Sequence, residues 1–544
     1  MSTSPVRLSV RLRQTLQPLQ QSDARRALAL SLAIGALVGL VTVAFILLTG
    51  RLAARMYPAG GAGWRRIFVP TLGSLITGYL LWRFFPFARG SGIPQTKFAL
   101  FINDGRIQFR TVFGKFFCCS ASLASGIALG REGPSVQVGA GLASVIARSA
   151  GLNKDQVMSL VPVGCSAALA AAFNTPIAAV LFSLEEIMGD LHAAVLGTAV
   201  LASATSWMVL HLVLGDDPLF HVPGYRLVHP VELAIYAALG VVGGLGSVAF
   251  VKLLLRLRDY FKGLPKWSAW FQPVAGGLTV GLLGYFRPEV MGVGYNYVDK
   301  ILNGDVVLKT VALLAILKIV ATAVSYSSGN AGGIFGPSLF IGATMGASVG
   351  SVAHHFFPTY TAGPGAYALV GMGTAFAGIV RTPLTSVIMI FELTRDYTII
   401  VPLMISNLIA YFISYGLQRA PIYEALAHQD GVHLPSAKTR EEGKRMRVNQ
   451  AMRVAPPAPA EADGDEFRRL AERLATSSEM PPHVHPDHDL SLALERMGAS
   501  GLTVLPVVSR ADVHKLLGIV VLDDVLRAFG VSRPSEARES TGLT

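Results

Sequence analysis

The stretch SGIALGREGPSVQVGA, Ser125–Ala140, recurs in altered form as SGNAGGIFGPSLFIGA, Ser328–Ala343. Nine of the sixteen aligned positions are identical, and all nine are glycine, alanine, serine or proline. A second block agrees further along at a slightly larger offset and pairs Gly164, Ala168, Ala170, Thr175, Pro176, Val180 and Glu185 with Gly371, Ala375, Ala377, Thr382, Pro383, Val387 and Glu392. Shared composition of helices rich in small residues is the competing explanation, and two collinear blocks weaken it. The sequence therefore predicts two related halves.

The composition indicates that most of this chain lies in a membrane. Of its 544 residues, 52% are hydrophobic and only 15% are charged, which is unlike a soluble protein. Apolar runs recur along the chain, and glycine and proline interrupt several of them, as in Gly130–Pro134 and Gly332–Pro337. Irregular backbone inside a bilayer survives only where it is buried in protein or lines a polar cavity. We expect an all-α polytopic membrane protein whose broken helices form a transport site.

Charge and composition divide the chain into three expected parts. The arginines Arg7, Arg11 and Arg13 precede the first apolar run and favour a cytoplasmic N-terminus. The parts are a basic cytoplasmic arm at 1–26, a transmembrane domain at 27–428 with repeat halves at about 27–214 and 231–420, and a cytoplasmic region at 429–544. In the last part, two β-branched and apolar runs are followed by a short amphipathic helix, Asp523–Phe529, which predicts a small α/β unit.

The net charge of +12 does not by itself indicate nucleic-acid binding, because basic surfaces serve membranes and anions equally well. No cluster of basic and aromatic residues stands apart from the apolar runs. Three cysteines lie inside apolar runs in a spacing that fits neither disulfides nor zinc: Cys118, Cys119 and Cys165. Three histidines gather in a stretch rich in proline and aspartate, without a second ligand group: His483, His485 and His488. We expect membrane lipids and an anion as partners, with no nucleic acid and no metal.

The segment Gly90-Ser91-Gly92-Ile93-Pro94 follows an apolar run and predicts a helix start. Gly90 and Gly92 let the backbone approach a ligand closely, and Pro94 suits the first helical turn. Ser91 offers a hydroxyl beside the unpaired N–H groups of the helix. An anion could bind there without a full positive charge. An ordinary serine N-cap is the alternative interpretation.

The segment Gly130-Arg131-Glu132-Gly133-Pro134 predicts a second helix start, but it carries a carboxylate. An ionised Glu132 could occupy the anion's place as a plug, and a protonated one could swing away. Pairing of Glu132 with Arg131 is the structural alternative.

The equivalent segment of the second half is uncharged and contains Gly333, Ile334, Phe335 and Pro337. Its backbone N–H groups could complete a cage around an anion. Glu185 and Glu186 end the apolar run 176–184 of the first half. Adjacent helix positions face about 100° apart, so at most one of these glutamates points wholly inward. An aqueous boundary is one explanation for the pair, and proton delivery to Glu132 is the other.

Together with a late tyrosine in Ala420-Pro421-Ile422-Tyr423, these motifs resemble the CLC family of chloride channels and proton-coupled chloride transporters. The resemblance covers roughly residues 30–428. It implies a homodimer in which each subunit has its own anion pathway, built from two halves of inverted topology. It also implies an integral membrane protein, in this case of a bacterial inner membrane, with both termini cytoplasmic.

The same resemblance assigns roles to matching residues. It implies that the hydroxyls of Ser91 and Tyr423 bind the central chloride, together with the backbone N–H groups of Ile334 and Phe335. It implies that Glu132 is the extracellular gating glutamate and Glu186 the intracellular proton glutamate. The supporting positions are Gly90, Gly92, Pro94, Gly130, Arg131, Gly133, Pro134, Gly333 and Pro337.

We therefore predict chloride transport by proton-coupled exchange. Channel-type members of the family typically have an apolar residue where this chain has Glu186, and the serine of the Gly-Ser-Gly-Ile-Pro motif favours chloride over nitrate or fluoride. A passive chloride channel is the alternative. A membrane-embedded enzyme using Glu185 and Glu186 is a distant one, because no HExxH or GxSxG motif is present. Lys97 stands where some bacterial relatives carry an acid, and the sequence assigns it no role.

The C-terminal region resembles CBS regulatory modules, which usually work in pairs. Val448–Met452 resembles the start of a first module, and Leu505–Val508 with Leu517–Val520 resembles the end of one. We expect an incomplete CBS-like region. Val521 stands three residues before Asp524, where nucleotide-binding members often have a hydroxyl, so neither a nucleotide nor another cofactor is predicted.

Overall fold

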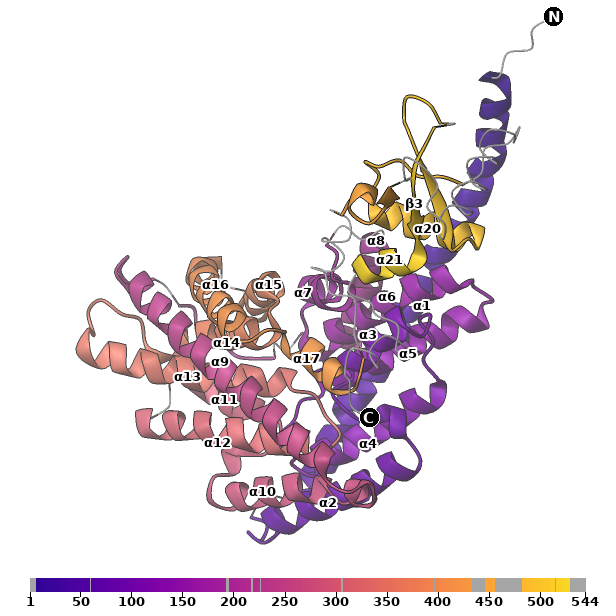
Figure 1. Ribbon diagram of the computed structural model, residues 1–544. Coiled ribbons are helices and arrows are strands. Elements are labelled where there is room, and N and C mark those ends of the chain that lie inside the picture. The colour runs from indigo at the N-terminus through magenta and orange to yellow at the C-terminus, as the bar shows by residue number, and fades with distance from the viewer. Residues whose placement is uncertain are drawn as a thin grey trace, which may run out of the picture. The chain divides into compact units, whose positions relative to one another are not determined.

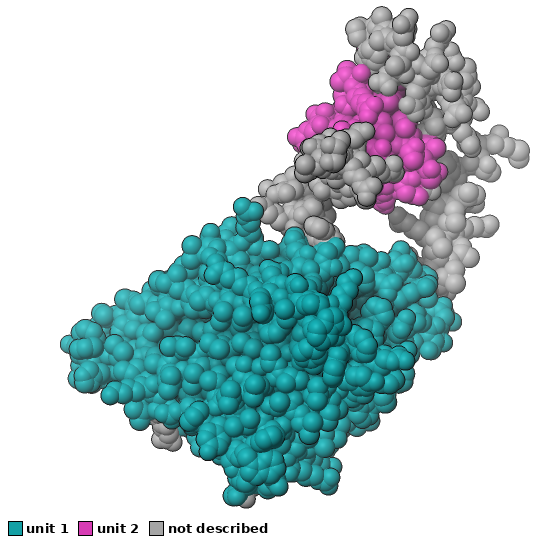
Figure 2. Space-filling model, turned by 60° about the horizontal axis from the view of Figure 1, so that its bottom comes forward, with its two compact units in different colours: residues 1–434 teal, residues 435–544 magenta. Residues whose placement is uncertain are grey.

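The structure is a computed structural model that describes residues 6–58, 60–191, 195–216, 219–225, 227–304, 307–395, 397–432, 446–454, 482–513 and 515–528, with side chains from residue 25 onward. The chain divides into two compact units, residues 1–434 and residues 435–544, which Figure 2 colours separately. Each unit is described by itself.

The described residues of the first unit are helical wherever they form regular structure. The helices are α1 (Val6–Met56), α2 (Arg65–Arg83), α3 (Ile93–Phe101), α4 (Phe109–Ala124), α5 (Glu132–Ser149), α6 (Lys154–Phe173), α7 (Pro176–Phe182), α8 (Leu196–Leu214), α9 (Glu232–Gly263), α10 (Pro273–Phe286), α11 (Tyr295–Leu302), α12 (Leu308–Ser327), α13 (Phe335–Phe356), α14 (Pro364–Val380), α15 (Pro383–Thr394), α16 (Ile400–Leu417) and α17 (Ile422–Gln429). One-turn 3-10 segments lie at Pro86–Ala88, Lys266–Trp270, Pro288–Val290 and Tyr397–Ile399, and a π-helical turn lies at Ser183–Met188. Six helices among the described residues are long and apolar enough to cross a membrane.

Equivalent helices of the two halves pack in the same way. In the first half α5 packs against α6 and α1 against α8, and in the second half α13 packs against α14 and α9 against α16. Helices α2 and α10 pack against each other and join the halves, as seen at the bottom of Figure 1. The fold thus confirms the two related halves.

The two apolar runs 156–184 and 366–391 are each broken into two helices. The first helix of each pair ends at a residue with left-handed backbone, Asn174 (φ 61°) or Arg381 (φ 66°). In both cases the second helix starts two residues later, at the proline of a Thr-Pro pair, because proline has no N–H to leave unpaired in the first turn. The resulting helices α7 and α15 are too short to cross a bilayer, which confirms broken helices.

Two equivalent glutamates link these short helices across the halves. Glu392, near the end of α15, accepts hydrogen bonds from the N–H groups of Ile177 (2.9 Å) and Ala178 (2.7 Å) at the start of α7. Glu185 in turn accepts from the N–H (2.8 Å) and the hydroxyl (2.6 Å) of Thr385 at the start of α15. Carboxylates satisfy the unpaired N–H groups and the positive end of a helix N-terminus. Of the adjacent pair at 185 and 186, Glu185 therefore contributes to packing.

The described part of the second unit contains a three-stranded antiparallel sheet. Strands β1 (Arg453–Val454), β2 (Val504–Val508) and β3 (Leu516–Val521) pair in the order β1-β3-β2, with helices α20 (Leu490–Ser500) and α21 (Leu522–Ala528). The small core includes Val448, Leu490 and Val520. The predicted strands and the short helix are present, and the segment at 448–452 packs into the same small core.

The glutamate links predict a measurable loss of stability. Glu392→Ala leaves two N–H groups at the start of α7 without their partner, so we expect the free energy of unfolding to fall by about 1–2 kcal/mol. Glu392→Gln keeps one acceptor oxygen without the charge, and its effect should be intermediate. Thermal unfolding of the detergent-solubilised protein measures both, and equal unfolding temperatures for the wild type and the two variants would contradict the role given to this link.

Candidate functional site

Two helix starts, one from each half, meet at a pair of glycines. The N–H of Gly130 donates to the carbonyl of Gly333, and the N–H of Gly333 donates to the carbonyl of Gly130, both at 2.7 Å. Helix α5 begins at Glu132 and α13 at Phe335, so this bridge brings their positive ends together. Backbone N–H groups concentrated in this way form a site suited to an anion.

The loop that carries Ser91 packs directly on this bridge. A Cβ atom at Gly92 (φ 105°) would collide with the carbonyl oxygen of Gly133, and a Cβ atom at Gly133 would collide with the carbonyl oxygen of Ser91. Glycine at both positions permits this close approach, and its freedom in φ permits the turn before α3. Three of the predicted motifs therefore meet at one place.

Ser91 and Tyr423 contribute buried hydroxyls to this region. Both residues are fully buried, and neither hydroxyl has a hydrogen-bond partner among the described residues. Tyr423 lies in α17, which packs against α3, and α3 begins two residues after Ser91. Buried hydroxyls without partners are uncommon in proteins, and such groups mark a place for a polar ligand.

Ile334 and Phe335 lie at the start of α13, where backbone N–H groups have no partner within the helix. Both residues are buried, and the Phe335 ring contacts those of Phe173 and Phe376, with centroids 4.7 and 4.3 Å apart. This packing fixes the helix start beside the Gly130–Gly333 bridge. The assignment of their N–H groups as chloride ligands stays a prediction.

The carboxylate of Glu132 is fully buried and lies at the N-terminus of the opposite half's helix. Its Oε2 accepts a hydrogen bond from the N–H of Gly336 at 3.2 Å, and its Oε1 accepts one from the hydroxyl of Tyr295. The alternative partner, Arg131, approaches Oε1 only to 4.0 Å through its Nε. An anionic side chain thus already occupies one of the helix starts that suit an anion.

The sequence analysis missed Tyr295, although a signal was present. Gly292-Val293-Gly294-Tyr295 repeats the pattern of Gly90-Ser91-Gly92-Ile93, and all four glycines have positive φ. Helix α11 follows the second pattern as α3 follows the first. Extending the repeat upstream of Ser125 and Ser328 would have identified this loop as the counterpart of the Ser91 loop.

Two buried lysines, also missed, hold these equivalent loops. Lys115 in α4 donates to the carbonyls of Ala88 (3.1 Å) and Gly90 (2.5 Å). Lys318 in α12 donates to the carbonyls of Val290 (2.9 Å) and Gly292 (2.6 Å). Each ammonium group replaces lost water with backbone acceptors, as a buried cation requires. The two loops are therefore fixed by the same interaction in each half.

Glu186, the second glutamate of the adjacent pair, lies in the π-helical turn after α7 and is nearly buried. It forms an ion pair with Lys97 of α3, with Nζ and Oε1 2.8 Å apart. The side chains of Lys97 and Glu186 are 15% and 7% exposed, so the pair lies at the edge of the protein interior. The contact gives Lys97 a place in the site that the sequence did not assign.

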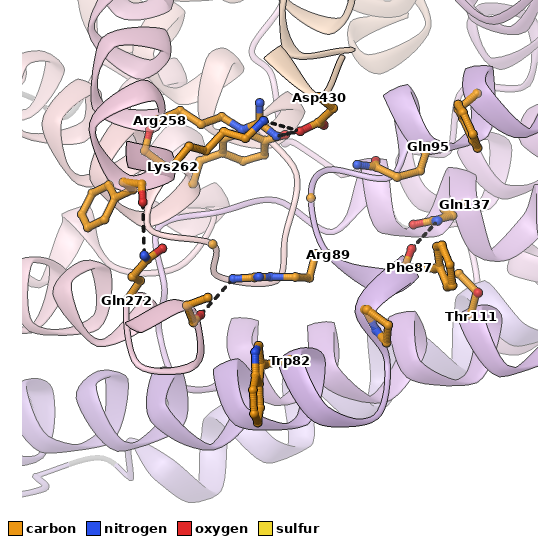
Figure 3. A pocket seen from close by; sticks show the side chains of 18 of the residues that line it. Trp82, Phe87, Arg89, Gln95, Thr111, Gln137, Arg258, Lys262, Gln272 and Asp430 are labelled. Carbon is orange, nitrogen blue, oxygen red and sulfur yellow. Dashed lines mark hydrogen bonds and ion pairs between the residues drawn. The ribbon is translucent and has the colours of Figure 1, made fainter. Parts of the chain in front are cut away.

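A cavity of about 660 Å³ lies next to the Ser91 loop, with Gly90 and Tyr326 in its wall. Its wall carries one acidic residue, Asp430, and five cationic ones: Arg89, Arg106, Arg258, Lys262 and Lys266. Asp430 pairs with both Arg258 (2.7 Å) and Lys262 (2.9 Å), as Figure 3 shows. The remaining cationic side chains give the wall an excess of positive charge beside the site.

The comparisons with known proteins agree with this geometry. A family model described as voltage gated chloride channel matches residues 73–415, and a CBS domain model matches residues 475–531. A ClcB-like chloride channel protein of Ralstonia nicotianae is 32% identical over 383 residues, which cover 69% of this chain and 89% of that protein. The H(+)/Cl(−) exchange transporter ClcA of Vibrio campbellii is 32% identical over 357 residues, covering 64% and 76%.

A solved structure has the same fold. The structure of a slow cyanobacterial Cl−/H+ antiporter matches with a TM-score of 0.70 at 25% identity, covering 74% of this chain and 98% of that one. The matched family residues contain the Gly90 loop, both helix starts and Glu186. The chain therefore belongs to the voltage-gated chloride channel family, the CLC family that its motifs resemble.

Proposed function

We propose that this protein moves chloride across a membrane in exchange for protons. Chloride binds between the hydroxyls of Ser91 and Tyr423 and the N–H groups of Ile334 and Phe335. Glu132 alternates between occupying the anion pathway as a carboxylate and leaving it as a neutral acid that carries a proton. Glu186 passes protons between water on the cytoplasmic side and Glu132. Chloride and protons are the only small molecules that this cycle needs.

One observation carries the proposal: the Glu132 carboxylate accepts a hydrogen bond from the Gly336 N–H at a helix start of the other half. A carboxylate and a halide compete for the same kind of site, because both are anions stabilised by helix N-termini. Protonation removes the charge of the carboxylate and hence its advantage in that competition. Chloride movement and proton movement then depend on one side chain.

The position of Glu186 favours exchange over a passive channel. Glu186 is 7% exposed and paired with Lys97, and taking such an ion pair out of water costs free energy that the attraction between the two charges often does not return. A passive chloride channel needs no acidic group there. The relative named as an exchange transporter and the structure titled as an antiporter support the same choice.

The cationic cavity supports the anion as substrate. Cations around a concave surface raise the local concentration of anions and speed their arrival. We assign this cavity as the cytoplasmic approach to the Ser91 loop, since the adjoining α17 leads into the C-terminal region. In that region Asp524 pairs with Arg453 at 2.7 Å, and we propose no nucleotide as a ligand there.

We further propose a homodimer in a bacterial inner membrane with both termini cytoplasmic. Large apolar side chains on α7, α8, α15 and α16 are exposed, among them Ile177, Leu212, Leu384 and Phe412. These helices adjoin one another. An exposed apolar surface of this kind needs lipid or a second subunit to cover it.

The exchange mechanism predicts distinct effects for the two glutamates. In vesicles containing the purified protein, an outward chloride gradient should drive protons inward against their own gradient. Glu186→Ala should abolish this proton movement and leave chloride flux, because the proton supply is lost while the anion site remains. Glu132→Ala should also leave chloride flux without proton movement. Parallel recordings with chloride and pH electrodes measure both ions.

The neighbouring Glu185→Gln is the matched control, because Glu185 binds the start of α15, and this variant should retain coupled movement. Proton coupling that persists in both alanine variants would reject the assigned roles. A wild-type protein that moves chloride without protons would establish the passive channel instead. A wild-type protein that moves no anion would reject chloride transport and favour the membrane-embedded enzyme.

The cationic cavity predicts a rate that depends on ionic strength. Arg106→Glu and Lys266→Glu, both at exposed positions of the wall, should each slow chloride transport about two- to five-fold at low salt. The difference should vanish at high salt, because exposed charges are screened. Lys309→Glu makes the same charge change at an exposed position outside the cavity and should leave the rate unchanged. Equal slowing by all three variants would refute a role of this cavity in anion access.

A further inference from the structure

We propose that Tyr295 is a latch: its hydroxyl holds the Glu132 carboxylate at the start of α13 and thereby sets how often chloride can displace it. Tyr295 acts through Glu132 and is a positioning residue. The inference rests on the proposed function, because it assumes that Glu132 must leave this place during each transport cycle.

The latch consists of two donors on two different oxygens. The Tyr295 hydroxyl donates to Oε1 of Glu132, and the N–H of Gly336 donates to Oε2 at 3.2 Å. A single donor would leave the carboxylate free to rotate about its hydrogen bond. Two donors fix both its position and its orientation, and hydrogen bonds to an ionised acceptor are stronger than neutral ones.

The ring of Tyr295 is itself fixed from two sides. The ring of Phe220 meets it edge-on, with centroids 5.4 Å apart, and the guanidinium carbon of Arg131 lies 5.7 Å from the ring centroid. Tyr295 is partly exposed whereas Glu132 is fully buried. Of the two side chains joined by this hydrogen bond, only that of Tyr295 therefore reaches solvent.

The backbone before Tyr295 is anchored to both halves. Lys318 donates to the carbonyl of Gly292, and the N–H of Gly292 donates to the carbonyl of Gly126 at 2.8 Å. Gly294 then turns the chain with φ 89°, a conformation that other residues adopt at a cost, so that α11 begins at Tyr295. The Tyr295 hydroxyl is thus held in place whether or not Glu132 is bound to it. Little conformational entropy is therefore lost when the hydrogen bond to Glu132 forms.

In the described part of the chain, polar groups of three other helices and of the neighbouring residue face Glu132. They are Tyr295 of α11, Arg131 beside it in the chain, the Gly336 amide of α13 and, further away, Tyr423 of α17. Arginine stays charged and tyrosine stays neutral between about pH 4 and pH 8.

Tyr295→Phe removes one oxygen atom and keeps the ring. At about pH 7.5, where the carboxylate must be displaced as an anion, chloride turnover in vesicles should rise about tenfold, the effect of one hydrogen bond to a charged group. At about pH 4.5 the rise should be smaller, because hydrogen bonds to a neutral carboxyl are weaker than those to a carboxylate. Proton coupling should persist, because Glu132 and Glu186 are unchanged.

Tyr297→Phe is the matched control. Tyr297 lies on the same helix, its ring stacks on Phe340 with centroids 6.1 Å apart, and its loss of a hydroxyl should change turnover at neither pH. The second control combines Tyr295→Phe with Glu132→Ala. Without the carboxylate there is nothing to latch, so the double variant should transport chloride at the rate of Glu132→Ala alone.

The outcomes separate this inference from the proposed function. Unchanged turnover in Tyr295→Phe, or an equal rise with and without Glu132, overturns the latch while leaving exchange intact. If Glu132→Ala remains fully coupled, the proposed function fails whatever Tyr295→Phe does. A rise that is larger at higher pH and is lost in the Glu132→Ala background supports both.

Discussion

The architecture depends on two backbone hydrogen bonds between Gly130 and Gly333. They join the starts of α5 and α13, which belong to different halves of the repeat. Side chains at these crowded positions would force the helices apart, since a Cβ atom at Gly130 would meet the N–H of Gly336 at 2.9 Å. The contact fixes where the two positive helix ends lie, and every other group of the site is placed in relation to it.

The site uses partial charges where a soluble anion-binding protein would use full ones. Helix starts and hydroxyls attract an anion, but they release it more easily than a buried arginine would. The buried lysines agree with this interpretation, because Lys115 and Lys318 donate their hydrogen bonds to backbone carbonyls of the supporting loops. They stabilise the shape of the site without supplying a direct ionic partner. A transport site has to bind and release its ion many times, and moderate attraction suits that requirement.

Site residues within short motifs could be predicted from the sequence, whereas residues that act through contacts between distant segments could not. Ser91, Glu132 and Tyr423 could be singled out because each stands in a short pattern of glycine and proline. Tyr295 and Lys318 lie in loops and helices upstream of the aligned blocks, and their partners are distant in the sequence. Helix geometry could not tell Glu185 from Glu186, and the family resemblance alone singled out Glu186. The structure gives the two side chains different partners, the start of α15 for Glu185 and Lys97 for Glu186. The strands of the second unit were predictable because their β-branched runs are local signals.

Helix α3 has only nine residues, and it connects the Ser91 loop to the ion pair of Glu186. Ser91 lies two residues before Ile93, the first residue of the helix, and Lys97, in its second turn, pairs with Glu186. Such a short, rigid rod cannot move at one end without moving at the other. If chloride binds at Ser91 as proposed, a small displacement on its arrival or departure would also change the contact between Lys97 and the Glu186 carboxylate. In the proposed cycle the two ions would then influence each other mechanically, through the first turn of α3, without being close together.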